Sequence, residues 1–144
     1  MSDAFDRFVE EVTGTIPSQR LTTDPLRVLA YGTDASFYRL TPKLVITVNT
    51  VQEVKAVVIA AYKNKVALTF RAAGTSLSGQ AVTDSVLVRL GDGWRDYYIH
   101  GLGERISLQP GVIGAQANRL LSSYGRKIGP DPASINAAMI GGIA

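Results

Sequence analysis

The segment from residue 44 to residue 71 constrains the fold most, because its hydrophobic pattern changes from strand-like to helical and back. Residues 44–48 form a short apolar run rich in β-branched side chains, which predicts a buried strand. Thr50 and Glu53 have the spacing of a capping box and predict a helix, and residues 67–71 predict a second strand. This order predicts a βαβ unit with a parallel strand pair. The residues expected on the buried face of the helix are Val51, Val54, Val58, Ala61 and Tyr62.

The first part of the chain, residues 1–40, predicts one helix followed by a lead-in segment. Apolar residues recur at helical spacing within residues 3–13, with Ser2 or Asp3 as the N-cap and a stop at Gly14. Prolines and glycines interrupt residues 16–41, so this stretch is expected to be irregular.

Residues 41–144 are expected to form one domain that contains the βαβ unit and a second group of strands. Residues 85–89 predict a third strand, and residues 96–100 and 105–109 predict a hairpin. An amphipathic helix follows and stops at Gly125, after which the chain is rich in small residues and turns. The predicted class is α+β, with a small parallel βαβ subdomain followed by the start of a mixed or antiparallel sheet subdomain.

Composition excludes several kinds of function. The 144 residues carry a net charge of +3 with a pI near 9.3, and the positive charges are dispersed rather than gathered in a basic stripe, so no nucleic-acid partner is expected. The chain contains no cysteine, which excludes disulfides and iron–sulfur ligation within it, and no metal site is expected. Its acidic N-terminus does not resemble a signal peptide, and no apolar run is long enough to span a membrane.

The most informative motif is the loop at residues 71–80, Arg-Ala-Ala-Gly-Thr-Ser-Leu-Ser-Gly-Gln, which starts at the carboxyl end of a predicted parallel strand. Gly74 and Gly79 allow positive φ, successive N–H groups can bind an anion, and the hydroxyls and Arg71 add further donors. A diphosphate suits this donor set. Gln80 stands where a P-loop requires lysine, so nucleotide hydrolysis is not expected. From these residues alone, a polar strand-exit loop without a ligand is the somewhat favoured interpretation.

Two motifs in the correct order resemble those of a known family. The run 71–80 resembles the phosphate loop of FAD-linked oxidases of the vanillyl-alcohol oxidase/p-cresol methylhydroxylase (PCMH) type. Residues 129–134 and 138–142 resemble the second flavin loop of that family, and Pro-Gly-Val at 110–112 lies between them in the expected place. The chain looks most like the bacterial D-lactate dehydrogenase/glycolate oxidase-like branch, over residues 41–144 and part of the lead-in.

The resemblance implies the N-terminal part of a PCMH-type FAD-binding domain that is incomplete at its C-terminus, with FAD as cofactor. Some relatives attach the flavin covalently to a histidine at the position of Thr75, so non-covalent FAD is expected here. The expected diphosphate contacts are Ala72, Ala73, Gly74, Thr75, Ser76, Gly79 and Gln80. The expected contacts to the flavin ring and ribityl chain are Pro130, Asp131, Ser134, Ala138, Gly141 and Gly142.

The implied function is that of a flavin-dependent oxidoreductase that oxidises a 2-hydroxy acid, such as D-lactate or glycolate, by hydride transfer to FAD. The substrate would bind the remainder of a longer parent protein, so this chain alone is expected to be inactive and its catalytic residues are unknown. An iron–sulfur cluster could lie elsewhere in such a parent. The implied location is cytoplasmic, with room for peripheral contact of the parent at the inner membrane face.

Two other functions remain open. One is a non-catalytic nucleotide-binding or interaction module on the same fold, and the other is a flavin reductase of the cell-wall precursor type. The Pro-Asp-Pro-Ala-Ser sequence at 130–134 favours the lactate-like branch over the latter. His100, the single histidine, matches no family base and is expected to be a surface residue of the hairpin.

Overall fold

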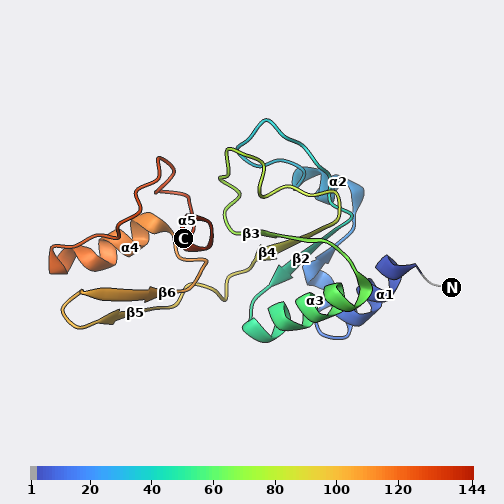
Figure 1. The fold of residues 1–144 in the computed structure, drawn as a ribbon, viewed down its shortest axis with the longest axis horizontal. Helices are drawn as coiled ribbons and strands as arrows, with labels where there is room; N and C mark the ends of the chain where they lie inside the picture. The colour runs from blue at the N-terminus through green and yellow to red at the C-terminus, as the bar shows by residue number, and fades with distance from the viewer. Residues whose placement is uncertain (1–2) are drawn as a thin grey trace.

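The structure is a computed structural model that describes residues 3–144, arranged as two lobes (Figure 1). The larger lobe is built on a four-stranded sheet of order β1-β2-β4-β3, formed by β1 (Leu21–Thr22), β2 (Leu44–Val48), β4 (Val86–Leu90) and β3 (Leu68–Arg71). β2 and β3 each pair with β4 in parallel, and β1 pairs with β2 in antiparallel orientation. The α+β class is therefore confirmed.

The βαβ prediction needs one correction. The strands β2 and β3 that flank helix α3 (Val51–Asn64) do not pair with each other, because β4 lies between them. The apolar run at 86–88 makes β4 suited to this central place, since Val86, Leu87 and Val88 are fully buried. A strand covered on both faces has no exposed side, so its sequence shows no alternation that could reveal its neighbours.

Alternate residues of the central strands supply two cores. Ile46 and Val88 point to one face and pack against α1 (Ala4–Thr13) and α3, where Phe8 is fully buried. Val45 and Leu87 point to the other face and pack against Val28 of α2 (Pro25–Ala30). Figure 1 shows the sheet between these helices. Burial on both sides explains why the strands are apolar throughout.

The N-terminal helices follow from their caps. Asp3 caps α1 in a capping box with Asp6, as expected; Ser2, the alternative cap, lies outside the described residues. Residues 16–41 are more ordered than the sequence predicted, because they contain α2 as well as the short 3₁₀ turn η1 (Ser18–Arg20) and β1. The Asp24 side chain accepts from the N–H of Arg27 and Pro25 occupies the first turn of α2, which is a recognised start signal.

The buried face of α3 differs from the predicted one. Val57, Ala60, Ala61 and Asn64 are buried, whereas Val58 is 43% exposed and Tyr62 is 88% exposed. The helix carries apolar side chains on two sides, so periodicity alone could not choose between them. Packing against α1 and the sheet selects the side with two alanines, where the backbones can approach closely. The stripe of Val51, Val54 and Val58 was expected to be core, and this is wrong for Val51 and Val58.

The smaller lobe holds the predicted hairpin and the helix that follows it. β5 (Tyr97–His100) and β6 (Arg105–Leu108) pair in antiparallel orientation, which confirms the hairpin. Helix α4 (Gly114–Leu121) continues into the 3₁₀ turn η2 (Ser122–Tyr124), and Gly125 ends it in the left-handed conformation. A one-turn helix, α5 (Ile140–Ile143), closes the chain between the two lobes (Figure 1).

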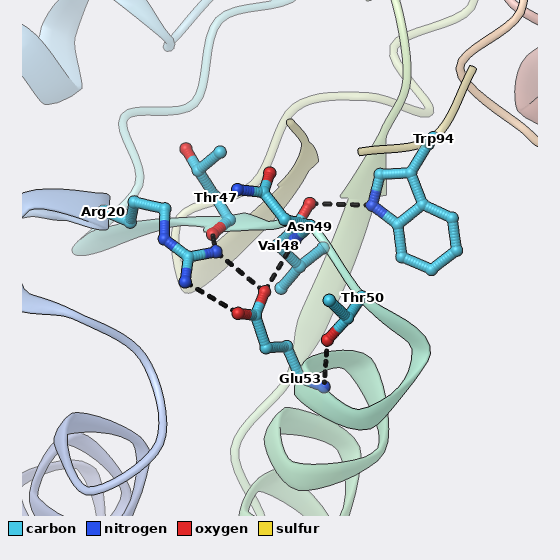
Figure 2. A network of polar contacts seen from close by, with 7 residues as sticks. All are labelled: Arg20, Thr47, Val48, Asn49, Thr50, Glu53 and Trp94. Carbon is cyan, nitrogen blue, oxygen red and sulfur yellow. Dashed lines mark hydrogen bonds and ion pairs between the residues drawn. The ribbon is translucent and has the colours of Figure 1, made fainter. Parts of the chain in front are cut away.

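A polar network fixes the corner between β2 and α3 (Figure 2). Arg20 donates two hydrogen bonds to the Glu53 carboxylate, at 2.6 and 2.8 Å, and Thr50 accepts from the Glu53 N–H as an N-cap. The Glu53 carboxylate accepts from the N–H of Asn49, one residue before the cap. Hydrogen bonds from Arg20 lower the pKa of Glu53 and outweigh the opposing effect of burial. The indole N–H of Trp94 donates to Val48 O, so the same corner holds the connection to the smaller lobe.

Candidate functional site

The loop between β3 and β4 leaves the sheet at the carboxyl ends of parallel strands and exposes a run of backbone donors. Gly74 and Gly79 have φ of 73° and 76°, as the sequence predicted for turn glycines. Within residues 3–144, no group accepts a hydrogen bond from the backbone N–H groups of residues 73–77. Ser76 Oγ accepts from the N–H groups of Ser78 and Gln80, at 3.2 and 3.3 Å, and contacts the Gln80 side chain. The loop is thus folded around Ser76 while its preceding N–H groups stay available for an anion.

Arg71 does not extend toward these donors. Its side chain is buried, its Nε donates to Ala81 O at 2.8 Å, and its Nη2 donates to Tyr31 O at 3.0 Å and also to Ala81 O. Burial lowers the pKa of Arg71, and the nearby Asp34 carboxylate acts in the opposite direction. The expectation that Arg71 supplies a donor to a phosphate is therefore wrong, since its guanidinium is occupied by main-chain carbonyls.

The second motif is held by the segment that precedes α4. The N–H groups of Gly114 and Ala115, at the start of α4, donate to Ala138 O and Ile135 O. In return, the N–H groups of Ile140 and Gly141 donate to Val112 O and Pro110 O, both at 2.9 Å. The N-terminus of α4 is consequently satisfied by the protein, and the Pro-Gly-Val segment at 110–112 serves as the backing of the second motif.

The two motifs, which are about fifty residues apart in the sequence, line one cleft of about 1120 Å³. All of the expected cofactor-binding residues except Gly79 line it. Gly79 lies against the ring of Tyr38 instead, and a Cβ at this position would be 2.7 Å from Tyr38 Cδ2. The lining residues absent from the expected set are Ala35, Phe70, Leu77, Ala81, Pro132, Ala133, Met139 and Ile143.

Four of these additional residues lie inside the two motifs, and Ala81 and Ile143 directly follow the motifs, so a fuller account of each motif would have included them. Ala35 and Phe70 are different. Ala35 comes from the lead-in segment and Phe70 from the end of β3, and no local pattern marks either as a site residue. Only the tertiary arrangement places them at the cleft.

The cleft presents neutral donors and apolar surface rather than ionisable groups. Asp131 is the one acidic or basic side chain among the described lining residues, and Lys127 contacts it at 3.2 Å. No cluster of His, Cys, Asp or Glu within residues 3–144 could hold a metal ion. His100 lies on β5, outside the cleft, with Nε2 2.8 Å from Ser107 Oγ. This surface suits a ligand that has a diphosphate and a large, mostly apolar ring.

Gly142 lines the cleft and has open space beside it. A Cβ at Gly142 would have no atom within 4 Å outside its chain neighbours and the backbone of its own helix, so packing of the described residues does not require glycine at this position. The neighbouring Gly141 differs, because its Cβ would lie 2.8 Å from Pro110 Cβ. A glycine that lines a cleft without a steric reason of its own fits close approach of a bound group.

The sequence model of the FAD-binding domain family matches residues 42–144. The chain belongs to this family. Among curated proteins it is similar to the glycolate oxidase subunit GlcD of Escherichia coli strain K12, with 28% identity over 130 residues. That match covers 88% of this chain and 26% of GlcD, so the chain spans about a quarter of the length of this relative.

Solved structures show the same fold. Alkyldihydroxyacetonephosphate synthase superposes with a TM-score of 0.79 at 19% identity, covering 96% of this chain and 28% of that protein. p-Cresol methylhydroxylase with bound substrate gives a TM-score of 0.74 at 14% identity, covering 94% and 28%. The domain therefore has the PCMH-type fold that the two motifs implied. No helix in the part of the chain that the structure describes has the length and apolar character needed to cross a membrane.

Proposed function

We propose that FAD binds in the cleft with its diphosphate on the N–H groups of residues 73–77 and its flavin along the second motif. The observation that carries this proposal is the run of backbone donors without a protein partner, placed opposite Pro130–Ser134 and Gly142 in one cleft. Backbone donors at a glycine turn stabilise a diphosphate without added charge. Thr75 offers no nucleophilic ring nitrogen, so we propose that the cofactor is held non-covalently. In this assignment residues 41–144 are the cofactor domain, and residues 1–40 are an N-terminal helix followed by the lead-in segment.

We further propose that the domain serves a flavin-dependent oxidoreductase that acts on a 2-hydroxy acid such as D-lactate or glycolate, in line with the similarity to a glycolate oxidase subunit. Bound flavin would supply the hydride acceptor for C2 of such a substrate. The residues of this chain would bind and orient the cofactor and keep water from its diphosphate. The only ionisable side chain of the described cleft, Asp131, is already engaged by Lys127. We therefore place substrate binding and proton abstraction on groups outside this cleft.

The location and partners follow the same proposal. We propose a cytoplasmic location, with peripheral contact of a longer parent at the inner membrane face. An iron–sulfur cluster in such a parent would be a separate electron acceptor, because this chain has no cysteine to ligate one.

The experiment that tests the proposal is reconstitution of the purified chain with FAD. We expect the absorption spectrum of bound oxidised flavin, and acid precipitation should release all of the flavin into the supernatant. Flavin that stays with the precipitate would contradict non-covalent binding. Failure of the chain to bind FAD would contradict the proposal. A parent protein that binds FAD but oxidises no hydroxy acid would instead favour a non-catalytic module on this fold.

A further inference from the structure

The lead-in segment, residues 31–38, precedes the region that matches the FAD-binding domain family, yet it contacts the phosphate loop directly. Ala35 lines the cleft, and the ring of Tyr38 lies against Gly79 at the far end of the loop. Internal hydrogen bonds shape the segment: Ser36 N–H donates to Asp34 Oδ1 at 2.8 Å, and Tyr38 N–H donates to Ser36 Oγ at 3.1 Å. The loop therefore rests on a preformed support that lies outside the matched domain.

Arg71 connects the loop to this support. It is the last residue of β3, where the loop begins, and it donates to the carbonyl of Ala81, where the loop ends. The same guanidinium donates to the carbonyl of Tyr31 in the lead-in segment. Its aliphatic part lies beside Gly74, because a Cβ there would be 3.3 Å from Arg71 Cδ. One buried side chain thus joins both ends of the loop and the segment behind it.

We infer that Arg71 is a positioning residue that, together with residues 31–38, holds the phosphate loop in its anion-binding conformation. This inference rests on the proposed function. A loop whose ends are fixed loses less conformational freedom when a ligand binds, so affinity rises without any new contact to the ligand. The guanidinium fork can serve two carbonyls at once, and a lysine ammonium is a single point charge on a flexible stem. A positive charge alone should therefore not replace Arg71.

The test compares FAD binding by the full chain with Arg71→Met, Arg71→Lys and the surface control Arg95→Met. Arg95 is an exposed arginine whose ion-pair partner is Asp92. We expect the Kd for FAD to rise about tenfold or more in both Arg71 variants, which corresponds to loss of charge-assisted hydrogen bonds, and to stay unchanged in the control. The salt dependence of the Kd should match that of the unmodified chain, because Nε and Nη2 of Arg71 donate to main-chain carbonyls and, in this inference, not to the phosphates.

Folding and loop order must be separated in this test. Urea unfolding of each variant without FAD gives the fraction folded, and the Kd is measured only where the variant is folded; should Arg71→Met fail to fold, Arg71→Lys decides. A merely structural role would lower the unfolding free energy and leave the Kd unchanged, which would overturn the inference. Wild-type affinity in Arg71→Lys, or a weaker salt dependence in Arg71→Met, would point to a charge effect and also overturn it. No binding by the unmodified chain would instead refute the proposed function.

Discussion

Replacement of Gly142 by valine tests the position of the cofactor most directly. A Cβ at this position meets no atom within 4 Å outside its chain neighbours and the backbone of its own helix, so the first atom of the added side chain creates no clash with the rest of the protein. Glycine and valine differ in helix propensity by less than about 0.5 kcal/mol, so the free energy of unfolding should change by no more than that. A ligand that fills the cleft against Gly142 would lose its close contact. We expect the Kd for FAD to rise at least about tenfold, or about 1.4 kcal/mol.

Gly129 and Gly141 provide controls, and the assay is fluorescence titration with FAD alongside urea unfolding of the free chain. Gly129→Ala adds a Cβ in equally open space, but Gly129 does not line the cleft, so both the Kd and the stability should be unchanged. Gly141→Ala forces a Cβ against Pro110 and should cost about 1–3 kcal/mol of stability. A folded Gly142→Val variant with wild-type affinity would refute the reasoning, because the flavin could not then occupy the space beside Gly142.

Three further predictions concern the loop and the fold. Gly74→Val should abolish FAD retention, because valine disfavours the φ of 73° at this turn; absorbance of the purified variant checks this, and retained flavin would show that the loop binds elsewhere. Glu53→Gln should cost about 1–3 kcal/mol at neutral pH, because it weakens the contact with Arg20. Because the pKa of Glu53 is lowered in the folded state, the stability difference between wild type and Glu53→Gln is fully present above the unfolded pKa of about 4.3. It disappears as the pH falls through the folded pKa. Unfolding curves measured across this pH range test the prediction, and a difference that does not change with pH would contradict it. Val57→Ala should lower the free energy of unfolding by about 1–3 kcal/mol and Val58→Ala by less than about 0.5 kcal/mol, because only Val57 of the two is fully buried. Urea unfolding measures both, and equal losses of stability would contradict the observed buried face of α3.

Local sequence signals were sufficient wherever a structural element depends on its own residues. The capping residues Asp3 and Thr50 begin α1 and α3 at the boundaries that the sequence indicated. The hairpin and its glycine turn also follow from local pattern, because Gly101 and Gly103 adopt the positive φ that the turn needs. Helix α2 was missed although Asp24 and Pro25 form a start signal, since its single buried residue, Val28, gives no periodicity over six residues.

Non-local choices could not be predicted in the same way. The place of β4 between β2 and β3 depends on which strands meet, and β2 and β4 are similar enough in apolar character that either could occupy the centre. The buried side of α3 depends on the helix and sheet that cover it, and Ala60 and Ala61 are selected by close approach rather than by hydrophobicity. These failures have a common cause, because the sequence of one element does not specify the shape of the surface it packs against.

The phosphate loop combines both cases. Its glycines and hydroxyls identify an anion-binding turn locally, and the structure gives Gly74 the required φ and leaves the adjacent N–H groups without a protein partner. Yet Arg71, expected only as an added donor, and Gly79, expected as a diphosphate contact, face the protein, toward Tyr31 O and the Tyr38 ring. A loop that binds an anion through main-chain N–H groups has low affinity unless its backbone is held in one conformation. Residues at the edges of the loop are therefore needed to fix that conformation. A charged residue or a glycine in such a motif should therefore be called a ligand contact only after its contacts with the carbonyls and aromatic rings behind the loop have been checked.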